Sequence, residues 1–144
     1  MGAEAGDYDI VVVDPPNLGL LTVNAIVAAT EVLVPVNMTD EGALQGAVEV
    51  RSIVAQLARR VDVRVRALVR QMVDRRRVVY QQMNAGLPEL GLPIARTEIP
   101  LTAAFQNAAA GRLPLLQWRA HAPGAEAYRE LAAELRAPIT AAAA

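Results

Sequence analysis

Apolar residues along this chain gather in short uninterrupted runs, separated by longer stretches in which apolar positions recur at helical spacing. The runs at 9–14 and 31–37 do not alternate between apolar and polar residues, so they predict strands buried on both faces. Residues 63–69 largely alternate apolar residues with arginine, which predicts a third strand with one partly wet face. Residues 94–99 predict a fourth strand, which ends at Pro100 because proline cannot continue a ladder.

Helices are predicted between and after these runs. A short apolar helix is expected at 20–29, and a longer one runs to about Arg60 from a cap at Thr39 or Asp40. Three more helices are predicted at 75–85, at 102–110 and from Pro123 onward, the first two ending at Gly86 and Gly111. The expected buried stripes are Ala47, Val50, Val54, Leu57 and Val61 in the long second helix, and Ala127, Tyr128, Leu131 and Leu135 in the last.

The alternation of strands with helices indicates βαβ crossovers and a mostly parallel sheet. The predicted fold class is therefore α/β, a partial parallel-sheet layer of Rossmann-like type with helices on both faces. No internal repeat or linker divides the chain, so we expect one domain at 1–138 and an alanine-rich tail at 139–144.

Asp14 is the strongest candidate for chemistry. It ends an apolar strand, and ligands of open parallel sheets bind at the carboxyl ends of strands. A carboxylate there can hold the water shell of Mg²⁺ or position a water for attack on a phosphate. The alternative is that Asp14 only caps a turn.

Composition excludes several kinds of site. All 14 basic side chains are arginine, so Schiff-base lysine catalysis and any phosphate site that needs its own lysine are excluded, although a GC-rich genome would also favour arginine. Cysteine is absent and His121 is the only histidine, which excludes thiol nucleophiles, zinc clusters and histidine-based triads. The net charge of −1 gives no overall bias toward nucleic acid.

A membrane or secretory location is not expected. The N-terminus is acidic, unlike a signal peptide, and the apolar stretch at 18–38 is interrupted by Asn24, Glu31 and Pro35. We therefore expect a cytoplasmic protein without a membrane partner.

The segment 8–25, YDIVVVDPPNLGLLTVNA, closely resembles the second signature block of ParA-type partition ATPases, in the ParA/MinD branch of the P-loop NTPases. Weaker matches follow in the family's order at 32–36, 74–76, 97–100 and 124–131. The resemblance covers about 7–135, nearly the whole chain.

The resemblance implies a P-loop NTPase-like fold with ATP and Mg²⁺ as cofactors. It implies that Asp14 is the catalytic and metal-binding residue near the γ-phosphate, and that Pro100 lies near the adenine base. The nucleotide-sensing loop would contain Pro15, Pro16, Asn17 and Gly19. The implied partners are a ParA-type subunit, a ParB-type protein and nonspecific duplex DNA, with association at the nucleoid.

The chain also departs from the family pattern. Asp14 directly precedes Pro15, one residue shorter than usual. The segment after Pro100, where the family usually has arginine and asparagine, reads Leu101, Thr102, Ala103 and Ala104. The family's GxxxxGK[ST] phosphate loop has no counterpart, because the GxxxxG spacing from Gly86 to Gly91 lacks the lysine and the hydroxyl. Since the family's phosphate-loop strand lies beside the strand ending at Asp14, we expect the apolar 10–13 edge to be covered by self-association, a partner or a separately encoded N-terminal half.

Basic residues offer a second candidate site. In the resembled family, arginines in the region of Arg75, Arg76 and Arg77 contact the DNA backbone, and such contacts are sensitive to salt and independent of sequence. The alternative is a solvated surface paired with acids such as Asp74. The candidate additions to this patch are Arg59, Arg60, Arg64, Arg66 and Arg70, of which the last three share one face of the third predicted strand.

The resulting hypothesis is a ParA-like partition protein for plasmid or chromosome segregation. We expect it not to hydrolyse ATP alone and to act through DNA or a ParA- or ParB-type partner. The alternatives are the C-terminal half of a complete ATPase whose first half is truncated or separately encoded, and a decayed product without activity.

Overall fold

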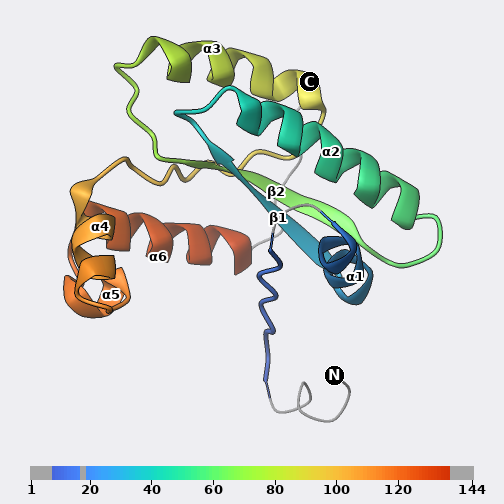
Figure 1. Cartoon of the computed structure of the whole chain (residues 1–144), viewed down its shortest axis with the longest axis horizontal. Helices are drawn as coiled ribbons and strands as arrows, with labels where there is room; N and C mark the ends of the chain where they lie inside the picture. The colour runs from blue at the N-terminus through green and yellow to red at the C-terminus, as the bar shows by residue number, and fades with distance from the viewer. Residues whose placement is uncertain (1–7, 17–18, 137–144) are drawn as a thin grey trace.

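A parallel pair of strands, β1 (Glu31–Asn37) and β2 (Arg64–Gln71), lies at the centre of the molecule (Figure 1). The computed structural model describes residues 8–16 and 19–136. The helices in chain order are α1 (Leu20–Ala28), α2 (Gly42–Leu57), α3 (Val78–Gly86), the 3₁₀ helix η2 (Leu87–Leu90), α4 (Ala103–Ala110), α5 (Leu115–Trp118) and α6 (Pro123–Arg136).

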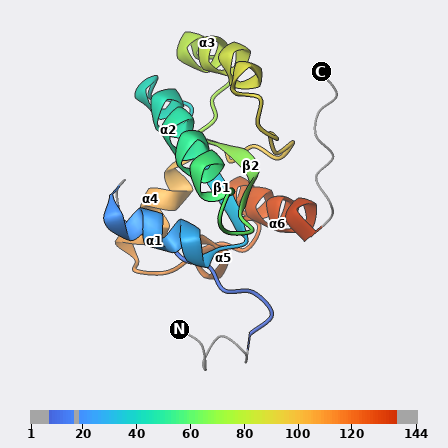
Figure 2. The ribbon, with the colours of Figure 1, turned by 90° about the vertical axis from the view of Figure 1, so that its right-hand side faces the viewer.

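Helices cover both faces of the strands, which confirms the predicted α/β class (Figures 1 and 2). On one face, Val34, Val36 and Leu68 pack against Ala47 of α2 and Met83 of α3. On the other face, residues of β2 pack against α6 through Ala67, Val69, Ala127 and Leu131. These strand residues therefore meet the apolar stripes of helices, which is the usual way a parallel sheet is buried.

Most predicted elements are confirmed with small shifts at their ends. The strand at 31–37 has its predicted bounds. The Oδ1 atom of Asp40 accepts from the N–H of Gly42 at 3.0 Å, so Asp40 supports the start of α2. In the last helix, Tyr128 is more exposed than its predicted place in the buried stripe, and its ring packs edge-on against Phe105.

The fourth predicted strand, 94–99, is wrong as a regular strand. The segment runs beside β2 but forms only one isolated bridge with it, Leu68 with Ile94, and a second bridge joins Pro100 to Val73 just after β2. The guanidinium group of Arg70 donates to the carbonyl oxygens of Ala95 (2.9 Å) and Arg96 (3.3 Å). The carboxylate of Glu134 accepts from the backbone N–H groups of Arg96 (2.7 Å) and Thr97 (2.9 Å). Side chains thus take backbone groups that a ladder would otherwise use.

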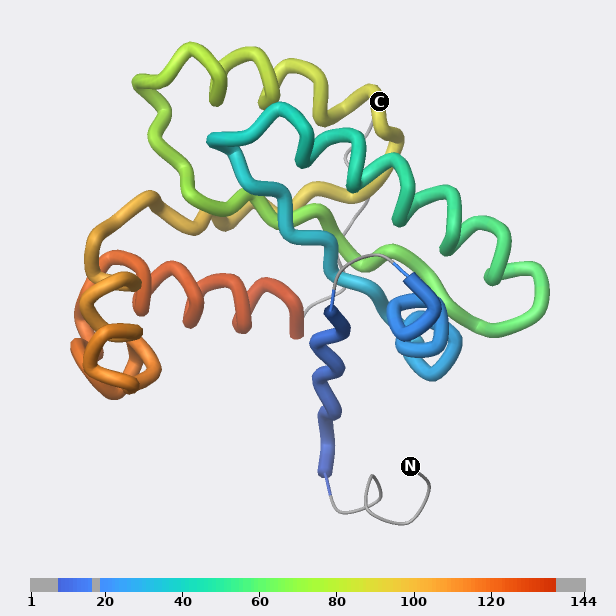
Figure 3. Tube along the Cα trace, in the orientation of Figure 1, coloured from blue at the N-terminus to red at the C-terminus, as the bar shows by residue number. Residues whose placement is uncertain are grey.

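The first predicted strand, 9–14, is also wrong as a buried strand. Its described backbone has no strand partner, and the side chains of Ile10 to Val13 are all exposed. Figure 3 shows this segment leaving the body of the molecule beside α1. A strand needs a neighbouring edge for its backbone groups, and within the described residues none is paired with it.

No helix among the described residues is long and apolar enough to span a bilayer. The division into a domain at 1–138 and a tail at 139–144 stays a prediction, and the tail lies outside the described residues.

The N-terminus of α6 is packed tightly against α4 and α5. A Cβ atom added to Gly124 would lie 2.6 Å from the Phe105 ring and 2.9 Å from Leu115. By contrast, a Cβ at Gly46, in the first half of α2, would meet nothing within 4 Å. Gly124 therefore allows a close contact between helices that a side chain would block, whereas Gly46 has room for a side chain.

We expect Gly124→Ala to lower the free energy of unfolding by about 1–3 kcal/mol, because the methyl group overpacks the contact with Phe105. Gly46→Ala is the matched control and should raise it by about 0.5–1 kcal/mol by removing backbone freedom from the unfolded chain. Urea denaturation followed by circular dichroism measures both changes. Equal effects of the two substitutions would contradict the packing around Gly124.

Candidate functional site

A cleft of about 700 Å³ opens at the carboxyl ends of the strands, where parallel α/β proteins bind ligands. Three segments line it: the turn after β2, the irregular segment before α4, and the first turns of α6. The charged and turn residues of its wall are Asp74, Arg75, Arg76, Arg96, Glu98, Pro100, Glu126 and Glu130. Its wall therefore carries both signs of charge.

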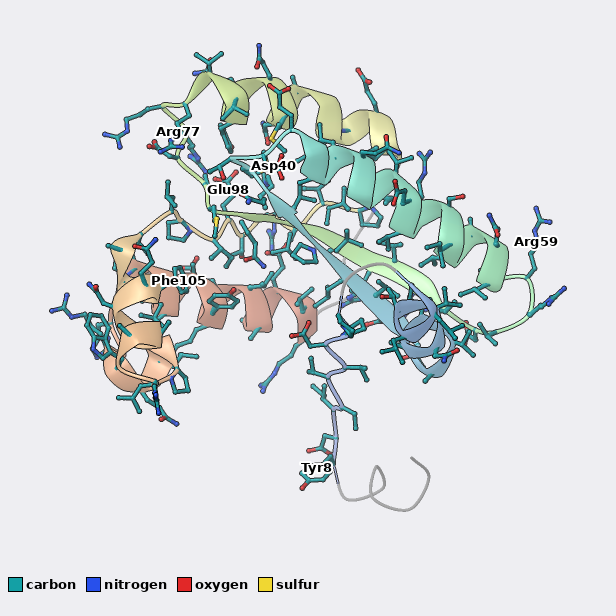
Figure 4. The ribbon with its side chains drawn as sticks, in the orientation of Figure 1. Tyr8, Asp40, Arg59, Arg77, Glu98 and Phe105 are labelled. Atoms are coloured by element: carbon teal, nitrogen blue, oxygen red, sulfur yellow. The ribbon has the colours of Figure 1, made fainter. Side chains whose placement is uncertain are left out.

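Glu98 is the best-connected side chain of this wall. Its carboxylate lies 2.7 Å from Nη1 of Arg70 and 2.8 Å from Nη2 of Arg75. The hydroxyl of Tyr80 donates to it at 2.8 Å. Figure 4 shows Glu98 at the same end of the strands as Arg77 and Asp40. Only 10% of the Glu98 side chain is exposed, so this carboxylate depends on its three donors.

The surroundings shift the pKa values of both Glu98 and Tyr80. Burial raises the pKa of Glu98, but the hydrogen bonds from Tyr80 and Arg75 and the charge of Arg70 outweigh it and leave the pKa below its ordinary value. Burial, together with the hydrogen bond to the Glu98 carboxylate, raises the pKa of Tyr80. Glu98 is therefore an ionised anchor and Tyr80 a neutral donor at neutral pH.

Asp74 organises the exposed arginines of the turn after β2. It accepts from Nε and Nη2 of Arg76 at 3.0 and 3.2 Å and lies 3.8 Å from Arg77. The side-chain hydrogen bond from Arg76 is the main reason that the pKa of Asp74 is lowered. The side chain of Arg76 is 91% exposed, and two arginines share one carboxylate, so this turn has an accessible positive charge.

The structure brings together some of the sequence-predicted site residues and not others. Pro100, Arg75 and Arg76 line the same cleft. Asp14 is exposed on the segment that leaves the body and does not line the cleft, and neither do Pro15, Pro16 and Gly19. Asn17 lies outside the described residues.

Two arginines of the third predicted strand have structural roles instead of extending a basic patch. The side chain of Arg70 is mostly buried against Glu98 and also donates to Oδ1 of Asn84 at 3.0 Å. Arg66 is mostly buried too and donates to the carbonyl oxygen of Leu135 at 2.7 Å. The addition of Arg66 and Arg70 to a DNA-binding patch is therefore wrong.

Sequence reasoning missed Glu98 and Tyr80. A usable signal was present, because Arg70 and Glu98 have opposite charges and both lie near the carboxyl ends of predicted neighbouring strands. Tyr80 carried no such signal, since its contact with Glu98 depends on where α3 packs.

One family model and several curated bacterial proteins are similar to this chain. The AAA domain family model AAA_31 matches residues 3–67. The chain is 34% identical over 136 residues to the chromosome-partitioning ATPase Soj of Thermus thermophilus, covering 92% of this chain and 54% of the relative. It is 28% identical to the sporulation initiation inhibitor protein Soj of Bacillus subtilis, covering 91% and 53%. It is 29% identical to the chromosome partitioning protein ParA of Caulobacter vibrioides, covering 90% and 50%. The chain spans about half the length of the curated relatives it matches.

The lowered pKa of Glu98 predicts a loss of stability in acid. A carboxyl whose pKa is lower in the folded than in the unfolded chain stabilises the fold above its ordinary value of 4.5, and this contribution is lost as pH falls through the lowered folded value. Glu98→Gln should therefore reduce stability by about 2 kcal/mol at neutral pH and flatten its fall below pH 4.5.

Urea midpoints measured across this pH range test the effect. Glu130→Gln is the matched control, because Glu130 lines the same cleft but is exposed. The same pH dependence in wild type and Glu98→Gln would show that Glu98 does not carry the linkage.

Proposed function

We propose that this chain, which is similar to ParA and Soj proteins over about nine tenths of its length, is a partition protein of chromosome or plasmid segregation that acts in the cytoplasm at the nucleoid. In this proposal it associates with duplex DNA and with a ParA- or ParB-type partner, and it does not hydrolyse ATP by itself. The observation that supports a DNA role is the exposed cationic turn at Arg76 and Arg77, beside the cleft at the carboxyl edge.

Only some of the residues that would be needed to bind MgATP are present in this sequence. One carboxylate such as Asp14 suits Mg²⁺, which is often held by one or two carboxylates together with substrate phosphates. The phosphate cradle itself needs a lysine and a hydroxyl at the end of a glycine loop, and these 144 residues contain no lysine. The residues present therefore fit a metal ligand but not a complete site for ATP.

We assign roles to the remaining residues within the same proposal. Asp14 would approach Mg²⁺ and the γ-phosphate only once a phosphate loop lies beside it. The turn with Pro15, Pro16, Asn17 and Gly19 would respond to the nucleotide, and Pro100, on the cleft wall, would lie near the base. These roles require a ParA-type subunit to supply the phosphate loop.

DNA contact would be electrostatic. Guanidinium groups bind phosphate oxygens without reading the base sequence, and each phosphate contact releases counterions. Arg75 is exposed but also bonded to Glu98, so we expect Arg76 and Arg77 to contribute more than Arg75.

A second candidate function is one half of a complete ATPase whose phosphate-loop half is on a separate chain. The exposed apolar side chains from Ile10 to Val13 favour it, since a strand of this composition is usually covered. Restoration of ATP turnover by adding such a half would distinguish it from the first proposal.

We expect the isolated chain to release no phosphate from MgATP above the protein-free rate, because it lacks the lysine of a phosphate loop. A colorimetric phosphate assay measures this, with Asp14→Asn as the control. Turnover that the wild type shows and Asp14→Asn abolishes would contradict the proposal, whereas equal turnover in both would indicate a contaminant.

For DNA, we expect the double substitution Arg76→Gln with Arg77→Gln to weaken binding to a labelled duplex of any sequence. The slope of log affinity against log salt should become shallower by about 0.9 for each phosphate that is no longer neutralised. Asp74→Asn should act in the opposite direction and tighten binding, because it removes the acid that both arginines share. Fluorescence anisotropy at several salt concentrations measures these changes.

The matched control for this experiment is Arg59→Gln with Arg60→Gln, which removes the same charge beyond the far end of α2, as Figure 4 shows for Arg59. If that control weakens binding as much as the Arg76 and Arg77 pair, net charge and not the turn after β2 carries the interaction.

A further inference from the structure

The two carboxylate oxygens of Glu98 have different kinds of partner. Oε1 accepts from the hydroxyl of Tyr80 at 2.8 Å and lies 2.7 Å from Nη1 of Arg70. Oε2 lies 2.8 Å from both Nε and Nη2 of Arg75. The side chain of Arg70 is 15% exposed, whereas that of Arg75 is 74% exposed. One oxygen is therefore fixed by donors inside the protein, and the other is occupied by a guanidinium group that solvent reaches.

The outer contact uses the donors with which arginine binds phosphate. Nε and Nη2 are neighbouring donors of the Arg75 guanidinium group, and both converge on Oε2 of Glu98. Arginine presents paired donors of this kind to the oxygens of carboxylates and phosphates alike. While the pair with Glu98 is closed, these two donors are not free for a phosphate of DNA.

Glu98 is a strong competitor for these donors because it is already held in place. Exposed ion pairs usually contribute little, since two long side chains must be ordered and salt screens their charges. Here Arg70 and Tyr80 order the Glu98 side chain, which is only 10% exposed, so Arg75 alone has to be ordered. A DNA phosphate that approached Arg75 would have to displace a carboxylate that is already in position.

The other two arginines of the turn are restrained differently. Arg76 and Arg77 share Asp74, which belongs to the same turn and moves with it. Glu98 reaches Arg75 from the segment before α4, on another part of the cleft wall. Arg75 is therefore bound to a fixed point outside the turn, and its availability depends on Glu98 and not on Asp74.

We propose that Glu98 is a specificity-determining residue that competes with phosphate for Arg75, so that the turn binds duplex DNA through Arg76 and Arg77 alone. Glu98 thereby limits the number of phosphates that the turn neutralises and keeps its affinity for duplex DNA low. This inference rests on the proposed function, because it requires the turn to bind DNA. It adds to that function the residue that sets the number of contacts.

Fluorescence anisotropy with a labelled duplex measures the slope of log affinity against log salt for single variants. Arg75→Gln should leave this slope unchanged, whereas Arg76→Gln should make it shallower by about 0.9. Glu98→Gln should make it steeper by about 0.9, so that its advantage over the wild type grows about eightfold for each tenfold fall in salt. Glu89→Gln is the matched control, because it removes the same charge from an exposed side chain of η2 and should not change the slope.

The double variant Glu98→Gln with Arg75→Gln identifies the cause of any gain. It should lose the steeper slope and return to that of Arg75→Gln. A gain that persists in the double variant comes from the lost negative charge and overturns the inference, as does an unchanged slope in Glu98→Gln. An Arg75→Gln slope as shallow as that of Arg76→Gln shows that Arg75 already contacts DNA, and also overturns it. Binding that is independent of both Arg76 and Arg77 contradicts the proposed function instead.

A measurement without DNA tests whether Glu98 withholds Arg75. Phenylglyoxal modifies free guanidinium groups, and mass spectrometry gives the rate at each arginine. In the folded wild type, Arg75 should react more slowly than Arg112, an exposed arginine whose side chain has no partner among the described residues. Glu98→Gln should speed the reaction of Arg75 and leave that of Arg112 unchanged. Equal rates at Arg75 and Arg112 in the wild type would overturn the inference whether or not the chain binds DNA.

Discussion

The guanidinium group of Arg70 joins three parts of the molecule that share no regular ladder. From β2 it reaches Asn84 on α3, the carbonyl oxygens of Ala95 and Arg96, and the carboxylate of Glu98. Arginine suits this position because its planar donors are fixed in direction and remain charged when buried. The segment that Arg70 contacts also forms the cleft wall beyond β2.

Glu134 has the complementary role from the opposite side of the same segment. Burial raises the pKa of its carboxyl, but hydrogen bonds from Arg96 and Thr97 outweigh this and lower the pKa, so it stays ionised. An arginine thus satisfies carbonyl groups of the segment while a glutamate satisfies its N–H groups. The segment is anchored to β2 and α6 at once, and α6 is held over its face of β2 by polar as well as apolar contacts.

Some parts of this fold can be predicted from local sequence, and others depend on residues far apart in the chain. Local patterns were sufficient for β1, for most helices and for the α/β class, because they depend on periodicity, prolines and glycines near in sequence. The irregularity at 94–99 could not be predicted, since it depends on Arg70 and on Glu134, a residue far along the chain. The 9–14 run has the composition of a buried strand, but composition does not say whether an edge is present to receive it. Pro100 lines the cleft. Glu98 could not be found from local sequence because its partners come from β2, the following turn and α3.

The sharing of Asp74 by Arg76 and Arg77 determines which change in the surroundings this turn can sense. Arginine does not lose its proton in proteins, and the hydrogen bond from Arg76 lowers the pKa of Asp74, so that carboxylate is ionised at neutral pH. The charge of the turn is therefore constant over the range of acidity found in a cell. What does vary is the screening of that charge by dissolved salt. The turn therefore responds to ionic strength and not to pH.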